Sequence, residues 1–450
     1  MKLDSSDTRP ASGTPISRRG FLKRGAAVAT GAAVFPAIIP ASAMGADGHV
    51  APSNRIVMGC IGVGSQGKGN MGNFLKRPDA QVVAVCDVDA GHRAEAKNLV
   101  NEAYGSVDCK EYNDFRELLT RDDLDALMLA LPDHWHSIPA ITAAQKGLHM
   151  YAEKPLAYSI GEGRAMVDAV NKAGVVWQTG SWQRSQAHFR KGCEIVRSGR
   201  IGRVHTVKVG LPTGKTIGPQ PEMPVPAGFD YDFWLGPAPW APYTEKRCHW
   251  DFRWILDYSG GQLTDWIGHH GDIANWGMGT ELTSPTSIRG GGLFPREGLW
   301  DAAIEYTFVC EFPAGVSPVA PDGFTMILSN SFPMGTRFEG TEGWVRVDRG
   351  EELETFPATL KDVPLGPNDV HLYESNDHFQ NFLDCCRSGE KCVAPIEPAY
   401  HAITLGLLGN IAMQLGRELK WDPTTEHFVD DPIADRKLMR PMRAPWSLPV

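Results

Sequence analysis

The sequence predicts an α/β protein. It has an N-terminal doubly wound parallel sheet, followed by a C-terminal α+β domain with an open, largely antiparallel sheet. Three observations indicate this. Apolar strands alternate with helices from residue 55 to about residue 180, a glycine-rich run follows the first strand directly, and strand-like runs become widely spaced after about Gly180. We therefore expect a first domain over residues 54–178, a second over 179–420, and a tail over 421–450.

The first domain is predicted from short apolar runs with helical stretches between them. Strands are expected at 56–61, 81–86, 126–131, 149–152 and 175–178, and helices at 90–104, 114–119 and 159–173. Strands that alternate with helices in this rhythm form a parallel sheet with helices on both faces.

The second domain has a different rhythm. A turn at 199–202 precedes a strand at 204–209, and a loop rich in Pro, Gly and Trp covers 212–243. Further strands are expected at 303–312, 324–329 and 343–347, and helices at 378–386 and 398–419. The tail is rich in Pro, Asp and Arg, and we expect it to wrap the surface or an oligomer partner.

Composition narrows the functional class. The chain has 450 residues and a net charge of -9, with no basic patch, so nucleic acid is not expected as a partner. Nine cysteines occur without a C-x-x-C pair, and we expect most of them to be buried thiols rather than a disulfide framework.

The N-terminus carries a targeting signal. Residues 17–23, Ser-Arg-Arg-Gly-Phe-Leu-Lys, resemble a twin-arginine export signal; an apolar stretch over 26–39 and an A-x-A cleavage site at 41–43 follow. Residues 1–43 are thus expected to be a signal peptide and 44–53 a linker, so that the folded protein is periplasmic or secreted. An uncleaved membrane anchor is the alternative, although the stretch is short and contains Pro36.

The glycine-rich run matches a dinucleotide fingerprint. Gly62 permits a tight turn, Gly64 lets the backbone approach a pyrophosphate, and Gly67 lets the helix pack on the strand. Asp87 lies twenty residues past Gly67, where an acid bonds the adenosine ribose and disfavours a 2′-phosphate. The sequence therefore predicts a Rossmann domain that binds NAD, although Ser65 or Lys68 could alter the preference. The intervening Ser65 and Gln66 are expected to line the same site.

Two further motifs identify a family. Residues 131–136, Leu-Pro-Asp-His-Trp-His, and residues 153–155, Glu-Lys-Pro, each follow a predicted strand. In this order after the fingerprint they resemble the Gfo/Idh/MocA family of sugar and polyol oxidoreductases, over about residues 54–420. The resemblance implies a C-terminal α/β domain often used for oligomerisation, and hence a dimer or tetramer.

Lys154 is the main catalytic candidate. It lies at the carboxyl end of a parallel strand, where open α/β sheets place their ligands, and could donate a hydrogen bond to the reacting oxygen. The resemblance also places Pro132, His136, Glu153 and Arg184 in the cofactor pocket and implies a cis bond before Pro155.

The stretch 258–272 carries the second catalytic group. Asp265 and His269 are four residues apart and so share one face of a helix, with Asp272 near the same face. By resemblance His269 is the general acid/base and Asp265 orients it or the substrate. His270 could face the pocket or pack structurally. A metal site built from these side chains is an alternative, but the family chemistry needs no metal and none is expected.

Aromatic and basic side chains precede this stretch. Sugar rings stack on aromatic faces, so we expect Trp182 and at least one aromatic residue of the loop to contact a sugar, with Arg253 as the polar contact. The loop's candidates are Trp234, Trp240, Tyr243, His249, Trp250 and Trp254.

These residues indicate an NAD-dependent oxidoreductase acting on a secondary hydroxyl of a sugar or glycoside. An alternative is a redox-neutral hydrolase, lyase or epimerase that keeps its NAD tightly bound and works through a keto-sugar. A third possibility, a non-enzymatic binding protein, is disfavoured by the intact Lys154, Asp265 and His269.

Overall fold

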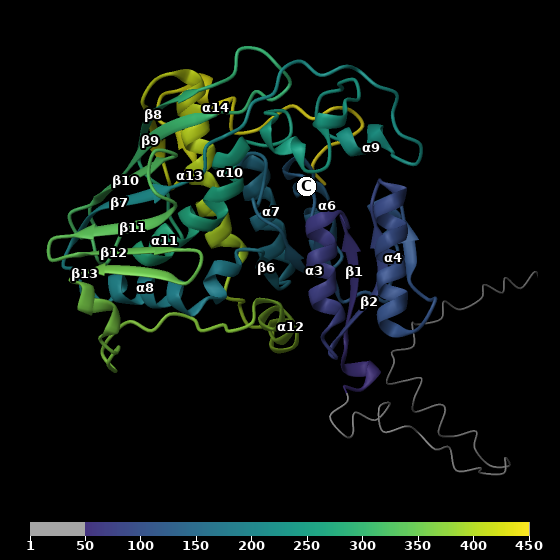
Figure 1. Ribbon diagram of the computed structural model, residues 1–450, viewed down its shortest axis with the longest axis horizontal. Helices are drawn as coiled ribbons and strands as arrows, with labels where there is room; N and C mark the ends of the chain where they lie inside the picture. The colour runs from purple at the N-terminus through teal and green to yellow at the C-terminus, as the bar shows by residue number, and fades with distance from the viewer. Residues whose placement is uncertain (1–49, 450) are drawn as a thin grey trace, which may run out of the picture. The chain divides into compact units, whose positions relative to one another are not determined.

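Two sheets organise the chain, as a computed structural model shows for residues 50–449 (Figure 1). The predicted signal peptide and residues 44–49 of the predicted linker lie outside the described residues. Residues 54–449 belong to one compact unit.

The first sheet is parallel and has six strands in the order β3-β2-β1-β4-β5-β6, the arrangement of a Rossmann fold. Its helices are α3 (Ser65–Leu75), α4 (Ala90–Tyr104), α5 (Phe115–Leu118), α6 (Ser137–Gln145) and α7 (Ile160–Ala173). Its strands are β1 (Ile56–Ile61), β2 (Ala80–Cys86), β3 (Lys110–Tyr112), β4 (Ala126–Leu129), β5 (His149–Ala152) and β6 (Trp177–Thr179).

Local sequence sets the ends of the helices in this domain. The Asp89 carboxylate accepts hydrogen bonds from the first turn of α4, and Gly105 ends that helix in the left-handed region. In α7 the Ser159 hydroxyl accepts a hydrogen bond from the Glu162 amide of the first turn, and Gly174 ends the helix in the left-handed region. These caps explain why the predicted helices at 90–104 and 159–173 have nearly the observed bounds.

The second sheet has nine strands in the order β13-β12-β11-β7-β10-β9-β8-β14-β15, and only β7 and β10 pair in parallel. Side chains of β9 alternate between the core and the exterior, which is typical of a sheet with one covered face. The strands are β7 (Val204–Gly210), β8 (Ser287–Leu293), β9 (Glu305–Phe312), β10 (Phe324–Ser329), β11 (Gly335–Gly340), β12 (Trp344–Asp348), β13 (Glu352–Phe356), β14 (Leu419–Asp422) and β15 (His427–Phe428).

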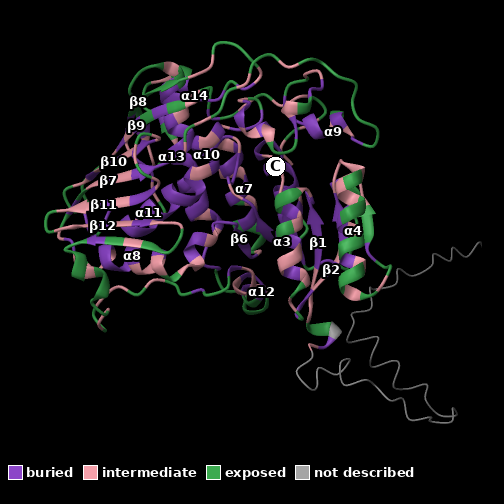
Figure 2. Cartoon of the chain, viewed as in Figure 1, coloured by how far each residue is buried: buried purple, intermediate pink, exposed green. Residues whose placement is uncertain are grey.

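Helix α13 (Ile396–Leu415) is buried almost all round, because it packs on α7 and on β8 (Figure 2). It therefore joins the Rossmann domain to the second sheet. The other helices of this half are α8 (Ala187–Arg197), α9 (Tyr231–Leu235), α10 (Gly261–Trp266), α11 (Asp272–Met278), α12 (His378–Ser388) and α14 (Pro432–Asp435), and a single π-helical turn, Ile267–Gly271, links α10 to α11.

The α/β fold class is confirmed, and so is every strand predicted above, with ends shifted by at most two residues.

The tail contacts the rest of the chain: the Arg440 guanidinium donates to Glu162 and to the His134 carbonyl. Within the described residues all nine cysteines are free thiols, and Cys386 alone is half-buried. None of the described helices combines the length and apolar character needed to cross a membrane.

Candidate active site

A cavity of about 780 Å³ opens at the carboxyl ends of β1, β2, β4 and β5, where a doubly wound sheet places its ligands. The second half of the chain closes its other side with residues 215–269 and Arg349. The predicted site residues that line it are Gly62, Gly64, Ser65, Gln66, Gly67, Asp87, Pro132, Glu153, Lys154, Trp182, Arg253, Asp265 and His269.

The glycine-rich loop fits a dinucleotide. Backbone packing alone requires Gly62 and Gly67, since a Cβ there would lie 2.2 Å from the Ala130 carbonyl oxygen and 1.9 Å from that of Gly62. A Cβ on Gly64 would meet no atom closer than 3.5 Å. The missing side chain at Gly64 therefore leaves open space at the start of α3, where a pyrophosphate passes.

Asp87 ends β2 and is held by the backbone. Its carboxylate accepts hydrogen bonds from the amides of Val63, at 2.8 Å, and Asp89, at 2.9 Å. This fixes the acid beside the glycine-rich loop, where it suits a ribose diol. Lys68, the residue that could have favoured a 2′-phosphate, instead forms an ion pair with Glu95.

Glu153 connects the lysine strand to the glycine-rich helix. Its carboxylate accepts hydrogen bonds from the side-chain amides of Gln66, at 3.2 Å, and Asn70, at 2.8 Å. The ideal Cβ of Gly180 would lie 2.8 Å from the same carboxylate, so this acid is closely packed. Glu153 thereby fixes the backbone that presents Lys154.

Residues 212–258, the cover segment, lie across the adenosine end of the cavity. The Ala90 amide donates to the Gly228 carbonyl, the Asp230 amide donates to the Val88 carbonyl, and the Asn113 side chain donates to the Asp230 carboxylate. These bonds tie the segment to the β2–α4 connection and to Asn113, which directly follows β3. Residues Phe229, Phe233, Trp234, His249 and Trp250 of the segment line the cavity.

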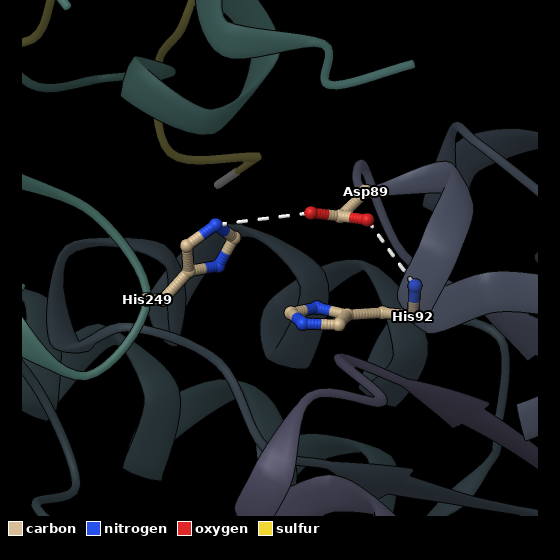
Figure 3. Close-up of side chains that lie close together, drawn as sticks. All are labelled: Asp89, His92 and His249. Atoms are coloured by element: carbon tan, nitrogen blue, oxygen red, sulfur yellow. Dashed lines mark hydrogen bonds and ion pairs between the residues drawn. The ribbon is translucent and has the colours of Figure 1, made fainter. Parts of the chain in front are cut away.

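A side-chain cluster lies at the same end (Figure 3). The Nε2 atom of His249, on the cover segment, is 3.7 Å from the Asp89 carboxylate, and the His249 ring lies edge-on to that of His92. The Asp87 carboxylate, 3.8 Å from Nδ1 of His92, raises the pKa of His92, whereas burial lowers that of His249. Within residues 50–449, Asp89, His92 and His249 are the only group with metal-ligand spacing.

Lys154 lies at the centre of the end of the cavity opposite the adenosine site. It follows β5, the Lys154–Pro155 bond is cis, and its ammonium donates to Oδ1 of Asp265 at 2.8 Å. Arg253 approaches the same oxygen at 3.4 Å. Although burial opposes the charge, these two cations hold the pKa of Asp265 below its usual value.

His269 reaches the cavity from the π-helical turn. Its ring packs against Trp266 and Trp182, and Nδ1 is buried without a hydrogen-bond partner among the described residues. Burial, followed by the charges of Lys154 and Arg349, lowers its pKa well below the ordinary value. The imidazole is therefore neutral, with a free nitrogen that can accept a proton. Gly268 allows the turn to approach Lys154, because its ideal Cβ would lie 3.2 Å from the lysine Cβ.

Three predicted site residues do not line the cavity. His136 contacts the carbonyls of Leu131 and Leu156, and so fixes the ends of the two loops around it. Arg184 is buried in a bidentate ion pair with Asp272, at 2.7 Å, and a second pair with Glu281.

The third is His270, which is fully buried. Its Nε2 lies 3.5 Å from Asp348, but burial lowers the pKa of His270 to about 3, so this contact is not an ion pair at neutral pH. The π-helical turn inserts an extra residue into the helix and so moves Asp272 off the face that it would share with Asp265 in a regular α-helix.

Sequence reasoning missed several residues of the cavity. Asp133 is fully buried, accepts a hydrogen bond from Ser259, and has a pKa raised by burial to about 7. Arg349, after β12, extends between the indoles of Trp182 and Trp266. Asp133 lies inside the motif at residues 131–136, which could have suggested a role in the site. The sequence around Arg349 contains no motif that points to a site. Lys215 and Gln262 also line the cavity.

Fold and site together define an NAD-binding oxidoreductase. Two family models match: "Oxidoreductase family, NAD-binding Rossmann fold" over residues 56–181, and "Oxidoreductase family, C-terminal alpha/beta domain" over residues 212–448. The second alone spans more than half of the chain, so the protein belongs to the Gfo/Idh/MocA family, as the resemblance predicted. NAD is its cofactor, and the substrate is a small molecule.

Two curated relatives are similar over most of the chain. An uncharacterized oxidoreductase, YrbE, of Bacillus subtilis is 28% identical over 69% of this chain and 80% of its own length. A myo-inositol 2-dehydrogenase of Thermotoga maritima is 26% identical over 81% and 98%. A glycosyl hydrolase family 109 protein of Saccharopolyspora erythraea is 32% identical, but over only 35% of this chain and 37% of its own.

Solved structures share the fold. The WlbA dehydrogenase of Bordetella pertussis, crystallised with NADH and UDP-GlcNAcA, has a TM-score of 0.58 at 19% identity, covering 82% of this chain and 99% of that one. An aldose-aldose oxidoreductase of Caulobacter crescentus also has a TM-score of 0.58, at 20% identity, covering 81% and 99%.

Proposed function

We propose that the protein oxidises a secondary hydroxyl of a sugar or glycoside. One observation carries this proposal: Lys154, Asp265 and His269 line the same cavity as the glycine-rich loop. Bound NAD supplies a hydride acceptor at this site. Relatives whose names give a polyol or an aldose as substrate support a carbohydrate.

Lys154 and His269 have different roles at the substrate hydroxyl. The Lys154 ammonium, held by Asp265, donates a hydrogen bond to the reacting oxygen and stabilises the negative charge that develops there. His269 is neutral and accepts the hydroxyl proton as the carbon–hydrogen bond breaks. Pro132 and Glu153 contribute to the cofactor side, and Trp182 and Arg253 to the substrate side. The buried Arg184 and His136 act as supports.

The second candidate is a redox-neutral reaction, in which the hydride returns to the substrate after elimination, hydrolysis or epimerisation. The cover segment favours it, because a tied-down segment over the adenosine end suits a cofactor that stays bound. Export through the predicted N-terminal signal to the periplasm, where NADH exchange is difficult, would favour it too. Partial similarity to glycosyl hydrolase family 109 proteins adds support.

One experiment separates the two candidates. The full chain is purified, its nicotinamide content is measured after denaturation, and a panel of p-nitrophenyl glycosides and free sugars is followed for absorbance at 340 nm and for released nitrophenol. NADH that accumulates with added NAD indicates net oxidation. Nitrophenol release with no net NADH indicates the redox-neutral cycle. If neither signal exceeds that of the Lys154→Met variant for any substrate, the proposed function is wrong.

A further inference from the structure

The cavity is lined by four cationic side chains. These are Lys154, Lys215, Arg253 and Arg349, and the carboxylate of Asp265 is already bonded to two of them, Lys154 and Arg253. Three other carboxyl groups line the same cavity. Asp87 accepts hydrogen bonds from the amides of Val63 and Asp89, Glu153 accepts them from the side-chain amides of the glycine-rich helix, and Asp133 accepts one from Ser259. Among the described residues, Lys215 and Arg349 therefore have no carboxylate in ion-pair range, although Asp265 and Asp348 attract Arg349 from further away.

Arg349 is an unpaired charge held in place. Its guanidinium lies 4.8 Å from the ring centre of Trp182 and 4.4 Å from that of Trp266. Within residues 50–449 it has no carboxylate within 4.0 Å, and its Nε is buried without a hydrogen-bond partner. The neighbouring Asp348 is bonded to Arg346 and to the backbone amide of Arg349.

Lys215 repeats this arrangement on the cover segment. Its ammonium lies 4.8 Å from the ring centre of Trp254, and in the part of the chain that the structure describes it has no acid in ion-pair range. Two cations that stand on aromatic faces thus line one cavity from two separate parts of the chain. Indole faces hold a cation in position without neutralising its charge.

Partial burial makes the charge of Arg349 costly. Loss of hydration lowers the pKa of this guanidinium, and neither of its indole neighbours can accept a charged hydrogen bond. A surface arginine would avoid this cost by turning into water. A ligand with an anionic group would relieve it, because the guanidinium fork matches carboxylate and phosphate oxygens.

We infer that the substrate is an anionic carbohydrate, one whose carboxylate or phosphate group binds Arg349 while its hydroxyl faces Lys154. The inference rests on the proposed function and names its substrate class. Because Arg349 and Lys154 line the same cavity, the anionic group and the reacting hydroxyl belong to one small molecule. Lys215, on the cover segment, adds to the positive potential of the cavity.

A binding measurement tests the preference for an anionic sugar and does not depend on turnover. Calorimetric titration of the NAD-loaded protein uses matched hexoses of the gluco and galacto series, each with a hydroxymethyl, a carboxylate or a phosphate ester at C6. We expect at least one anionic member to bind about tenfold or more tightly than its neutral partner, the gain of one charge-assisted hydrogen bond. The carboxylate and phosphate arms distinguish the two anions. No preference for an anion in either series, including no binding at all, overturns the inference.

Three variants locate the effect. Arg349→Met keeps the packing stem and should abolish the preference for the anion over the matched neutral sugar. Arg349→Lys should retain part of it, and Arg203→Met, at an exposed ion pair with Asp322, should retain all of it. NAD content and melting temperature show that each variant is folded. A folded Arg349→Met protein that still prefers the anion overturns the inference. Because binding is measured, failure of the proposed oxidation would appear separately.

Discussion

The ammonium of Lys154 and the carboxylate of Asp265 lie 2.8 Å apart, although 111 residues separate them. The lysine comes from the end of a Rossmann strand and the aspartate from α10 of the second half. The pair thus joins the cofactor side of the cavity to its substrate side. Arg253 shares the aspartate, so the lysine is positioned but keeps donor capacity for a substrate oxygen.

Removal of the Lys154 ammonium should abolish most of the activity. We expect Lys154→Met to lower kcat/KM about 10²- to 10⁴-fold, because a positioned, charged hydrogen-bond donor is lost at the reacting oxygen. Steady-state kinetics on the holoprotein measure this, with NAD content unchanged. The matched control is Lys146→Met, at an exposed position after α6. Equal activity of the two variants would refute the catalytic role of Lys154.

The glycines of α3 should differ sharply in tolerance. Gly67→Ala should lose NAD and melt at a lower temperature, since its Cβ would lie 1.9 Å from the Gly62 carbonyl oxygen. Gly69→Ala, two residues along the same helix, meets nothing within 4 Å. It should be neutral or stabilising by up to about 1 kcal/mol. Thermal melts and retained nicotinamide are the measurements, and normal NAD retention by Gly67→Ala would contradict the packing argument.

We expect Arg184 to contribute to the stability of the fold and not to catalysis. Arg184→Met leaves Asp272 as a buried acid without its cation and removes one of the two cationic partners of the half-buried Glu281, so it should lower the free energy of unfolding by about 3–5 kcal/mol. The control is Arg203→Met, which breaks an exposed pair with Asp322 and should cost less than about 1 kcal/mol. Urea unfolding measures both. A small effect of Arg184→Met on stability, together with a large loss of NAD affinity, would show that Arg184 acts in cofactor binding.

Asp133 should make stability depend on pH. Its pKa is raised from 3.8 to about 7, so between these values the folded protein holds a proton that the unfolded chain has released. The contribution of this carboxyl to stability therefore falls as pH rises through that window. Compared with Asp133→Asn, the wild type should lose about 2–3 kcal/mol between pH 5 and pH 8.

Unfolding of both proteins at the two pH values, with NAD in fixed excess, measures the difference. Asp108→Asn, at an exposed position, serves as the control and should follow the wild type. A difference between wild type and Asp133→Asn that does not change with pH would show that Asp133 is not protonated in the fold.

The Rossmann half could be predicted from the sequence because its signals are local. Apolar runs mark the strands, and Glu153-Lys154-Pro155 stands directly after one of them. Strand β3 (Lys110–Tyr112) escaped because it is short and polar, and β8 (Ser287–Leu293) because glycines weaken its pattern. Both depend on pairing with neighbouring strands.

The substrate side could be predicted only in part. Asp265 and His269 follow a helical spacing, and both reach the cavity. The π-helical turn, which contains His269, interrupts the regular spacing before Asp272, and no residue pattern predicts it, so Asp272 pairs with Arg184 outside the cavity. Arg349 reaches the cavity by sheet pairing between distant strands, which a linear sequence does not reveal.

The bonds between the cover segment and the β2–α4 connection have a kinetic consequence. We expect release of the adenosine end to require the hydrogen bonds at Gly228 and Asp230 to break together, so that opening of the segment sets the dissociation rate of the dinucleotide. Affinity for NAD and its residence time would then be separately adjustable. We expect a chain of this design to keep one working equivalent of NAD in surroundings that hold no free nicotinamide.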